Sequence, residues 1–199
     1  MIARPRGRAA PATQTAVGRR IDLSVRLHDR GWSRILPAPS RVVRRASLAA
    51  LAAAEKAGCA LLASARDDRT RWELGILLAD DATVQRLNRE YRRVDKPTNV
   101  LSFSGVWARA AGAAGAPLAL GDVVLARETV AAEALAQAKL VADHVSHLVV
   151  HGVLHLLGYD HQSAGEAGAM ERLEVGVLAM LGIDDPYADD GRRRLIQGR

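Results

Sequence analysis

The 199-residue sequence is poor in cysteine, in aromatic side chains and in long apolar runs. Its single cysteine, Cys59, permits no intramolecular disulfide, which fits a reducing cytoplasm, and its alanine- and leucine-rich setting predicts a buried thiol. No apolar run reaches the roughly 18 residues that a membrane span needs. The chain also does not open with the apolar segment of a secretion signal. We therefore expect a cytoplasmic protein that does not enter a membrane.

Acidic residues are missing from both ends of the chain. Residues 1–20 carry five arginines and residues 191–199 carry four, so removing these nine charges from the net +6 leaves −3 for residues 21–190. We expect a disordered basic extension over 1–19, one domain over 20–187 and a basic tail over 188–199. Such ends are solvated or touch nucleic acid. A transit peptide is the alternative for the first segment, although proline and glycine would interrupt its amphipathic helix.

Histidine is scarce except in one segment, because five of the six histidines lie between residues 144 and 161. His151, His155 and His161 follow at i, i+4 and i+10. Residues four apart share one face of a helix, so the first two can present ring nitrogens to a single ion. Gly158 can end that helix in the left-handed conformation and bring His161 round as a third ligand. Three neutral imidazoles with an open fourth position make a catalytic site for one zinc ion.

Other polar residues near this trio have more than one interpretation. His147 lies one turn before His151, so it either orients a ligand, contacts substrate or is an ordinary polar helix residue. His144 is expected at the surface. Asp160 could support a histidine, act as a base or cap the turn, and we favour the structural role. Asp122, in a predicted strand, is equally ambiguous between a supporting contact and a substrate contact.

Hydrophobic periodicity predicts an α+β domain with a small mixed sheet of four strands, about five helices and a zincin-like helix that carries the metal ligands. A loop is expected over 105–119, where glycine and alanine are frequent. The predicted strands cover about 21–25, 72–79, 99–103 and 121–126, and the predicted helices about 40–57, 81–92, 128–140, 143–157 and 165–181.

Four segments carry a resemblance to a known family. The first is His-Gly-Val-Leu-His-Leu-Leu-Gly-Tyr-Asp-His at 151–161, and the others are 88–103, 120–124 and the residues Met170–Glu174 with Asp185–Tyr187. Together they resemble the YbeY family of bacterial rRNA maturation factors over roughly residues 20–187. The sequence departs from the family pattern at Ser104, where proline is usual, and in a longer segment over 105–119.

The resemblance implies a zinc-dependent endoribonuclease for single-stranded RNA that acts in rRNA maturation and ribosome quality control. The partners of such an enzyme would be rRNA and a ribosomal subunit or ribosomal protein. It also implies that His151, His155 and His161 are the zinc ligands and that Arg92 is a basic active-site residue. Arg92 could otherwise be a solvated residue at a helix end. Arg86, Arg89 and Arg93 form a basic helix face nearby, which is either simply solvated or a track for the RNA backbone.

The histidine spacing is also that of metzincin proteases, which carry a glutamate as general base beside the first histidine. Here that position is Gly152, which cannot take a proton, so peptide hydrolysis lacks its usual base. RNA cleavage suffers less, because a neighbouring 2′-hydroxyl can attack internally or zinc can lower the pKa of bound water to about 7. Two alternatives stay open: a metalloprotease-like hydrolase, and a non-catalytic ribosome-binding factor with a structural zinc ion.

Overall fold

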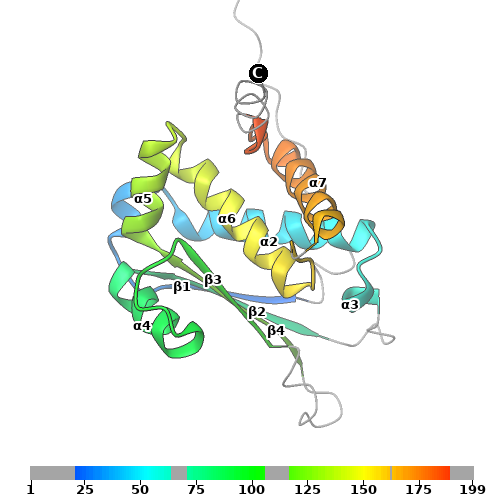
Figure 1. The fold of residues 1–199 in the computed structure, drawn as a ribbon, viewed down its shortest axis with the longest axis horizontal. Helices are drawn as coiled ribbons and strands as arrows, with labels where there is room; N and C mark the ends of the chain where they lie inside the picture. The colour runs from blue at the N-terminus through cyan, green and yellow to red at the C-terminus, as the bar shows by residue number, and fades with distance from the viewer. Residues whose placement is uncertain (1–20, 64–70, 106–116, 162, 189–199) are drawn as a thin grey trace, which may run out of the picture.

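The computed structural model describes residues 21–63, 71–105, 117–161 and 163–188, which form one α+β unit (Figure 1). Apolar residues at helical and strand periods define its elements, as the sequence predicts. In chain order the elements are β1 (Ile21–Leu27), α1 (Trp32–Ile35), α2 (Pro39–Lys56), α3 (Ala60–Ala63), β2 (Trp72–Ala79), α4 (Asp81–Arg92), β3 (Val100–Ser104), β4 (Leu118–Ala126), α5 (Arg127–Ala136), α6 (Val141–Leu156) and α7 (Ala164–Leu181).

The four strands form one mixed sheet in the order β1-β2-β4-β3. β1, β2 and β4 run parallel, and β3 pairs antiparallel with β4. The β2–β4 register shifts between Glu73 and Leu74, where Gly121 takes a φ of +135° that favours glycine. The order of the strands makes β3 an edge strand beside β4. α6 packs over this edge of the sheet.

Helices cover the two faces of the sheet unequally. α2 and α6 pack on one face, with α7 packed against these two helices, whereas α4 lies against the other face near β3 and β4 (Figure 1). Alternate residues of β2, namely Trp72, Leu74, Ile76 and Leu78, are almost fully buried in the main core under α2 and α6. A smaller apolar cluster, with Val84 and Leu101 at its centre, lies under α4. The main core therefore provides a rigid base for α6, the helix that carries most of the histidines.

The predicted fold class and its four strands are confirmed. All five predicted helices are present. Two helices of four residues, α1 and α3, were not predicted, because one turn is too short for a periodic signal. β4 begins at Leu118, so it takes in the end of the segment predicted as a loop over 105–119. The described ranges contain no helix that is both long and apolar enough to cross a membrane. The predicted ends, 1–19 and 188–199, lie outside the described residues except for Ala188.

Candidate metal centre and cleft

α6 ends as the glycine at position 158 predicts. Leu157 caps the helix, and Gly158 follows in the left-handed region with a φ of +89°. The Gly158 N–H donates to the His155 carbonyl at 3.0 Å, and the Tyr159 N–H donates to the Leu154 carbonyl at 3.1 Å. These two bonds form a Schellman motif, which satisfies the last helical carbonyls and reverses the chain. The reversal brings His161 back to the helix end.

The three predicted ligands meet at this end of α6. The Nε2 atoms of His151 and His155 face each other at 3.1 Å. Two nitrogens bound tetrahedrally to one zinc ion at about 2.0–2.1 Å would lie about 3.3 Å apart, so this pair has the spacing of ligands to a shared ion. The centroid of the His161 ring lies 5.0 Å from that of His155 and 6.0 Å from that of His151. The geometry therefore fits a metal, and the ligand assignment stays a prediction.

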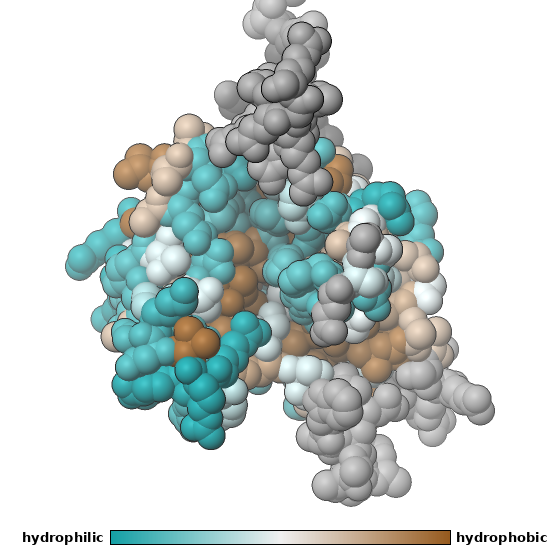
Figure 2. All heavy atoms as spheres, viewed as in Figure 1, coloured by the Kyte–Doolittle hydropathy of each residue, from teal (hydrophilic) through white to brown (hydrophobic). Residues whose placement is uncertain are grey.

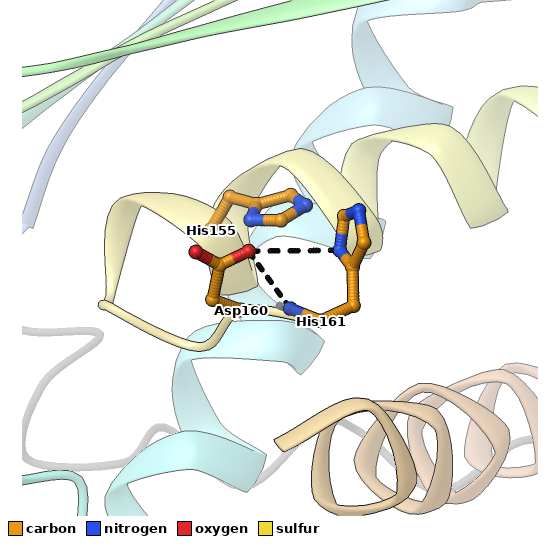
Figure 3. A group of neighbouring side chains, drawn as sticks. All are labelled: His155, Asp160 and His161. Atoms are coloured by element: carbon orange, nitrogen blue, oxygen red, sulfur yellow. Dashed lines mark hydrogen bonds and ion pairs between the residues drawn. The ribbon is translucent and has the colours of Figure 1, made fainter. Parts of the chain in front are cut away.

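Asp160 joins this group from the turn after α6. Donor atoms of His155, Asp160 and His161 all lie within 4.8 Å of one another (Figure 3). Asp160 Oδ1 also accepts a hydrogen bond from the His161 backbone N–H at 2.8 Å. This bond favours the structural role, the carboxylate is also placed to provide an oxygen ligand beside the histidines, and the role of Asp160 stays a prediction.

His155 lies in an environment that favours a neutral, metal-binding imidazole. Burial lowers the pKa of His155, and the nearby rings of His151 and His161 lower it further. A neutral imidazole keeps a lone pair for a metal, whereas a protonated one has none. The position of His155 at the centre of the group therefore suits a ligand at neutral pH.

Glu174, a buried carboxylate on α7 behind the histidines, was not predicted from the sequence. Glu174 is only 1% exposed, and its Oε1 lies 2.7 Å from His151 Nδ1. Its Oε2 accepts a hydrogen bond from the Tyr187 hydroxyl and lies 3.8 Å from His147 Nε2. Burial alone would raise the pKa of Glu174, but the nearby His147 and the hydrogen bonds from His151 and Tyr187 outweigh it and lower the pKa to about 2. His147 therefore lies near the carboxylate that contacts His151, one of the predicted ligands.

A cleft of about 500 Å³ opens beside the histidines, and its lining comes from four parts of the chain. The face of the molecule drawn in Figure 2 is mainly polar, with apolar surface in a hollow near its centre. Ser104, the departure from the family pattern, is at the rim. The lining residues are Arg92, Asn99, Val100, Ser102, Ser104, His151, His155, Leu156, Asp160 and His161.

The predicted basic residues divide into two sets. Arg92, at the end of α4, lines the cleft with the histidines. Arg86, Arg89 and Arg93 are exposed and do not line it, and Arg89 pairs at 3.5 Å with Asp95. Arg92 is thus the arginine best placed for a substrate in the cleft.

Two sequence-based interpretations need correction. His144 is buried, not at the surface, because its Nε2 lies 2.9 Å from Glu133 Oε2 on α5. Asp122 lies on the α4 side of the sheet and lines a separate cavity of about 770 Å³. The next residue, Val123, faces α6, and neighbouring strand residues point to opposite faces. Asp122 therefore does not support the histidine group.

Comparison with known proteins agrees with this geometry. The family model described as Endoribonuclease YbeY matches residues 45–182. Proteins named Endoribonuclease YbeY from Rhodospirillum rubrum and Azorhizobium caulinodans are 52% and 48% identical to this chain. The first alignment covers 79% of this chain and 77% of the relative, and the second covers 84% and 97%. A relative of the same name from Paramagnetospirillum magneticum is 64% identical over 59% of this chain and 72% of its own length. The chain therefore belongs to the endoribonuclease YbeY family.

Proposed function

We propose that this protein is a zinc-dependent endoribonuclease that cleaves single-stranded RNA and acts in rRNA maturation and ribosome quality control. The observation that carries the proposal is the meeting of His151, His155 and His161 in a cleft that Arg92 also lines. Such a cleft combines metal ligands with a cation for phosphate. Membership of a family named for endoribonuclease activity supports RNA as the substrate.

The three histidines would hold one zinc ion. When bound, zinc would act as a Lewis acid toward a phosphodiester and lower the pKa of water. His161 leaves the site accessible, since its side chain is 59% exposed at the edge of the cleft. Structural zinc sites are usually closed by four protein ligands, so an accessible site favours catalysis over a purely structural ion.

The chain's own residues would bind and orient the RNA. Arg92 carries a planar guanidinium, which bonds a phosphate through two parallel N–H groups. The hydroxyl groups of Ser102 and Ser104 are available along the same cleft, and Ser102 Oγ donates to the Gly152 carbonyl at 3.3 Å. Asn99 instead supports the cleft wall, because its amide donates to Glu133. We propose that Arg92 holds the phosphate at the predicted metal site.

The setting of the cysteine agrees with the cytoplasmic location that we propose. Cys59 is buried as predicted and carries a free thiol. We propose that rRNA, presented by a ribosomal subunit or ribosomal protein, is the partner in that compartment.

The test begins with the metal content of the full chain purified without added metal, because nickel can also occupy a three-histidine site. The same protein is then incubated with a labelled single-stranded RNA and with its duplex. We expect bound zinc, cleavage of the single strand, loss of cleavage with a chelator and recovery on adding zinc. A His155→Ala variant prepared in parallel identifies contaminating nuclease. Equal cleavage by that variant would refute the proposal.

A further inference from the structure

A buried carboxylate lies behind the predicted zinc site and does not line the cleft. Glu174 comes from the middle of α7 and is 1% exposed. Burying a charge is costly unless hydrogen bonds compensate, so a carboxylate persists in such a place only with well-placed donors. Glu174 has such donors on both oxygens, and they come from two other parts of the chain.

The first oxygen faces a predicted metal ligand. Glu174 Oε1 lies 2.7 Å from His151 Nδ1. An ionised carboxylate only accepts hydrogen bonds, and a neutral imidazole has one N–H. The proton of His151 is therefore held on Nδ1, which leaves the lone pair on Nε2. That Nε2 is the atom that faces His155 Nε2 at 3.1 Å.

The second oxygen ties the chain segment after α7 to the same carboxylate. Glu174 Oε2 accepts a hydrogen bond from the Tyr187 hydroxyl. Tyr187 lies beyond the helix end at Gly182, and its backbone N–H donates to Asp185 Oδ1 at 2.8 Å, which sets the turn. The Tyr187 ring packs edge-on against His147, with 5.8 Å between the centroids. Glu174 thus has one oxygen on the histidine and the other on a separate anchor.

We propose that Glu174 is a positioning residue for the metal centre: it fixes the tautomer and ring orientation of His151, and Tyr187 holds the carboxylate in place. The inference rests on the proposed metal site. Groups that orient a ligating histidine typically contribute about 10- to 100-fold to metal affinity. Glu174 needs no contact with substrate for this role, and α7 with its following turn becomes part of the metal site.

The main test compares zinc dissociation constants by chelator competition for the full chain, a Glu174→Gln variant and a Glu171→Gln variant. Glutamine keeps the size and an acceptor oxygen but removes the charge. We expect zinc binding about 10- to 100-fold weaker in Glu174→Gln. Glu171 is exposed one turn earlier on α7, so Glu171→Gln loses the same charge and should bind zinc like the wild type. Equal affinity in all three proteins would overturn the proposal.

A second readout distinguishes positioning from general stabilisation. Long-range proton–nitrogen NMR of the metal-free wild-type chain at neutral pH reports which nitrogen of His151 carries the proton. We expect the Nδ1–H form, and an Nε2–H form would overturn the proposal. Neither readout uses RNA. A wild-type chain that binds zinc normally but does not cut RNA would therefore contradict the proposed function and leave the proposal for Glu174 intact.

If Glu174→Gln does not fold, Tyr187→Phe provides the affinity test. Phenylalanine keeps the ring beside His147 and removes only the hydroxyl donor to Glu174. Zinc binding should weaken, but by less than about tenfold, because the bond from His151 remains. Unchanged affinity would show that Tyr187 does not hold the carboxylate.

Discussion

Gly152 on α6 packs directly against Val123 on β4. A β-carbon built on Gly152 would lie 2.8 Å from Val123 Cγ1, closer than atoms normally approach, and 3.1 Å from Ser102 Oγ. The helix can approach the sheet this closely only because residue 152 has no side chain. The glutamate that metzincins use as a general base would have no space at this position. Packing and chemistry therefore both disfavour the protease alternative.

This contact predicts that Gly152→Ala destabilises the protein. Overpacking costs about 1–3 kcal/mol, and the better helix propensity of alanine returns at most about 1 kcal/mol. Gly176→Ala is the matched control, because Gly176 lies inside α7 with no atom near its added β-carbon. We expect the control to gain about 0.5–1 kcal/mol. Urea unfolding of both variants measures this, and a more stable Gly152→Ala would contradict the packing.

The sequence predicted those features whose cause is local. The spacing of His151 and His155 places them on one helix face, and the conformational freedom of glycine explains the turn at Gly158. Both depend on residues within a few positions. The orientation of Asp122 was also accessible, because the strict alternation of a strand sends Asp122 and Val123 to opposite faces.

The features that the sequence analysis missed depend on distant partners. His144 is buried because Glu133 on another helix meets its ring. Glu174 follows His151 by 23 residues, and nothing in local periodicity pairs the two. A carboxylate on a helix usually faces solvent, so its burial becomes visible only when α6 and α7 pack together.

His155→Ala should abolish zinc retention, since His155 lies between His151 and the two possible ligands of the following turn, Asp160 and His161. Metal analysis of the purified variant measures the loss, with circular dichroism to show that the helices persist. His28→Ala is the control, because His28 is exposed on a different part of the chain. Full zinc retention in His155→Ala would remove it from the ligand set.

Asp160→Asn distinguishes two ligand sets. If the three histidines hold the metal, this variant should retain zinc, because the amide oxygen can still accept the His161 backbone N–H. If Asp160 replaces His151 as a ligand, zinc should be lost from Asp160→Asn and kept in His151→Ala. We expect the first result. Parallel metal analysis of the two variants decides between the sets.

Arg92→Glu should keep zinc and lose RNA cleavage. Arg92 lines the cleft without belonging to the group of metal donors, so its charge acts on substrate and not on the ion. Loss of one hydrogen-bond donor that stabilises a transition state typically costs about 10²- to 10³-fold in rate. Arg44→Glu on α2 makes the same charge change at an exposed residue outside the cleft and should cut normally. Wild-type cleavage by Arg92→Glu would exclude Arg92 from the active site.

The burial of His144 predicts a loss of stability in mild acid. Burial lowers the pKa of His144, and the nearby His147 and Lys139 lower it further, which together outweigh the hydrogen bond that His144 donates to Glu133. In the unfolded chain a histidine has a pKa of about 6.5, so below that pH the unfolded state takes up a proton that the folded state resists. The stabilising contribution is therefore present above about pH 6.5 and is lost as the pH falls toward the folded-state pKa.

The measurement is the free energy of unfolding at pH 7.5 and 5.5, for the wild type and His144→Gln, with chelator present. The loss on acidification should be smaller in the variant, by no more than about 1.4 kcal/mol per pH unit, the limit for one proton. His155, whose pKa is also lowered, titrates in both proteins and cancels in the comparison. An equal loss of unfolding free energy in the two proteins would contradict this prediction. It would mean that the His144 ring takes up a proton as easily in the folded state as in the unfolded chain, because its contact with Glu133 offsets the cost of burial.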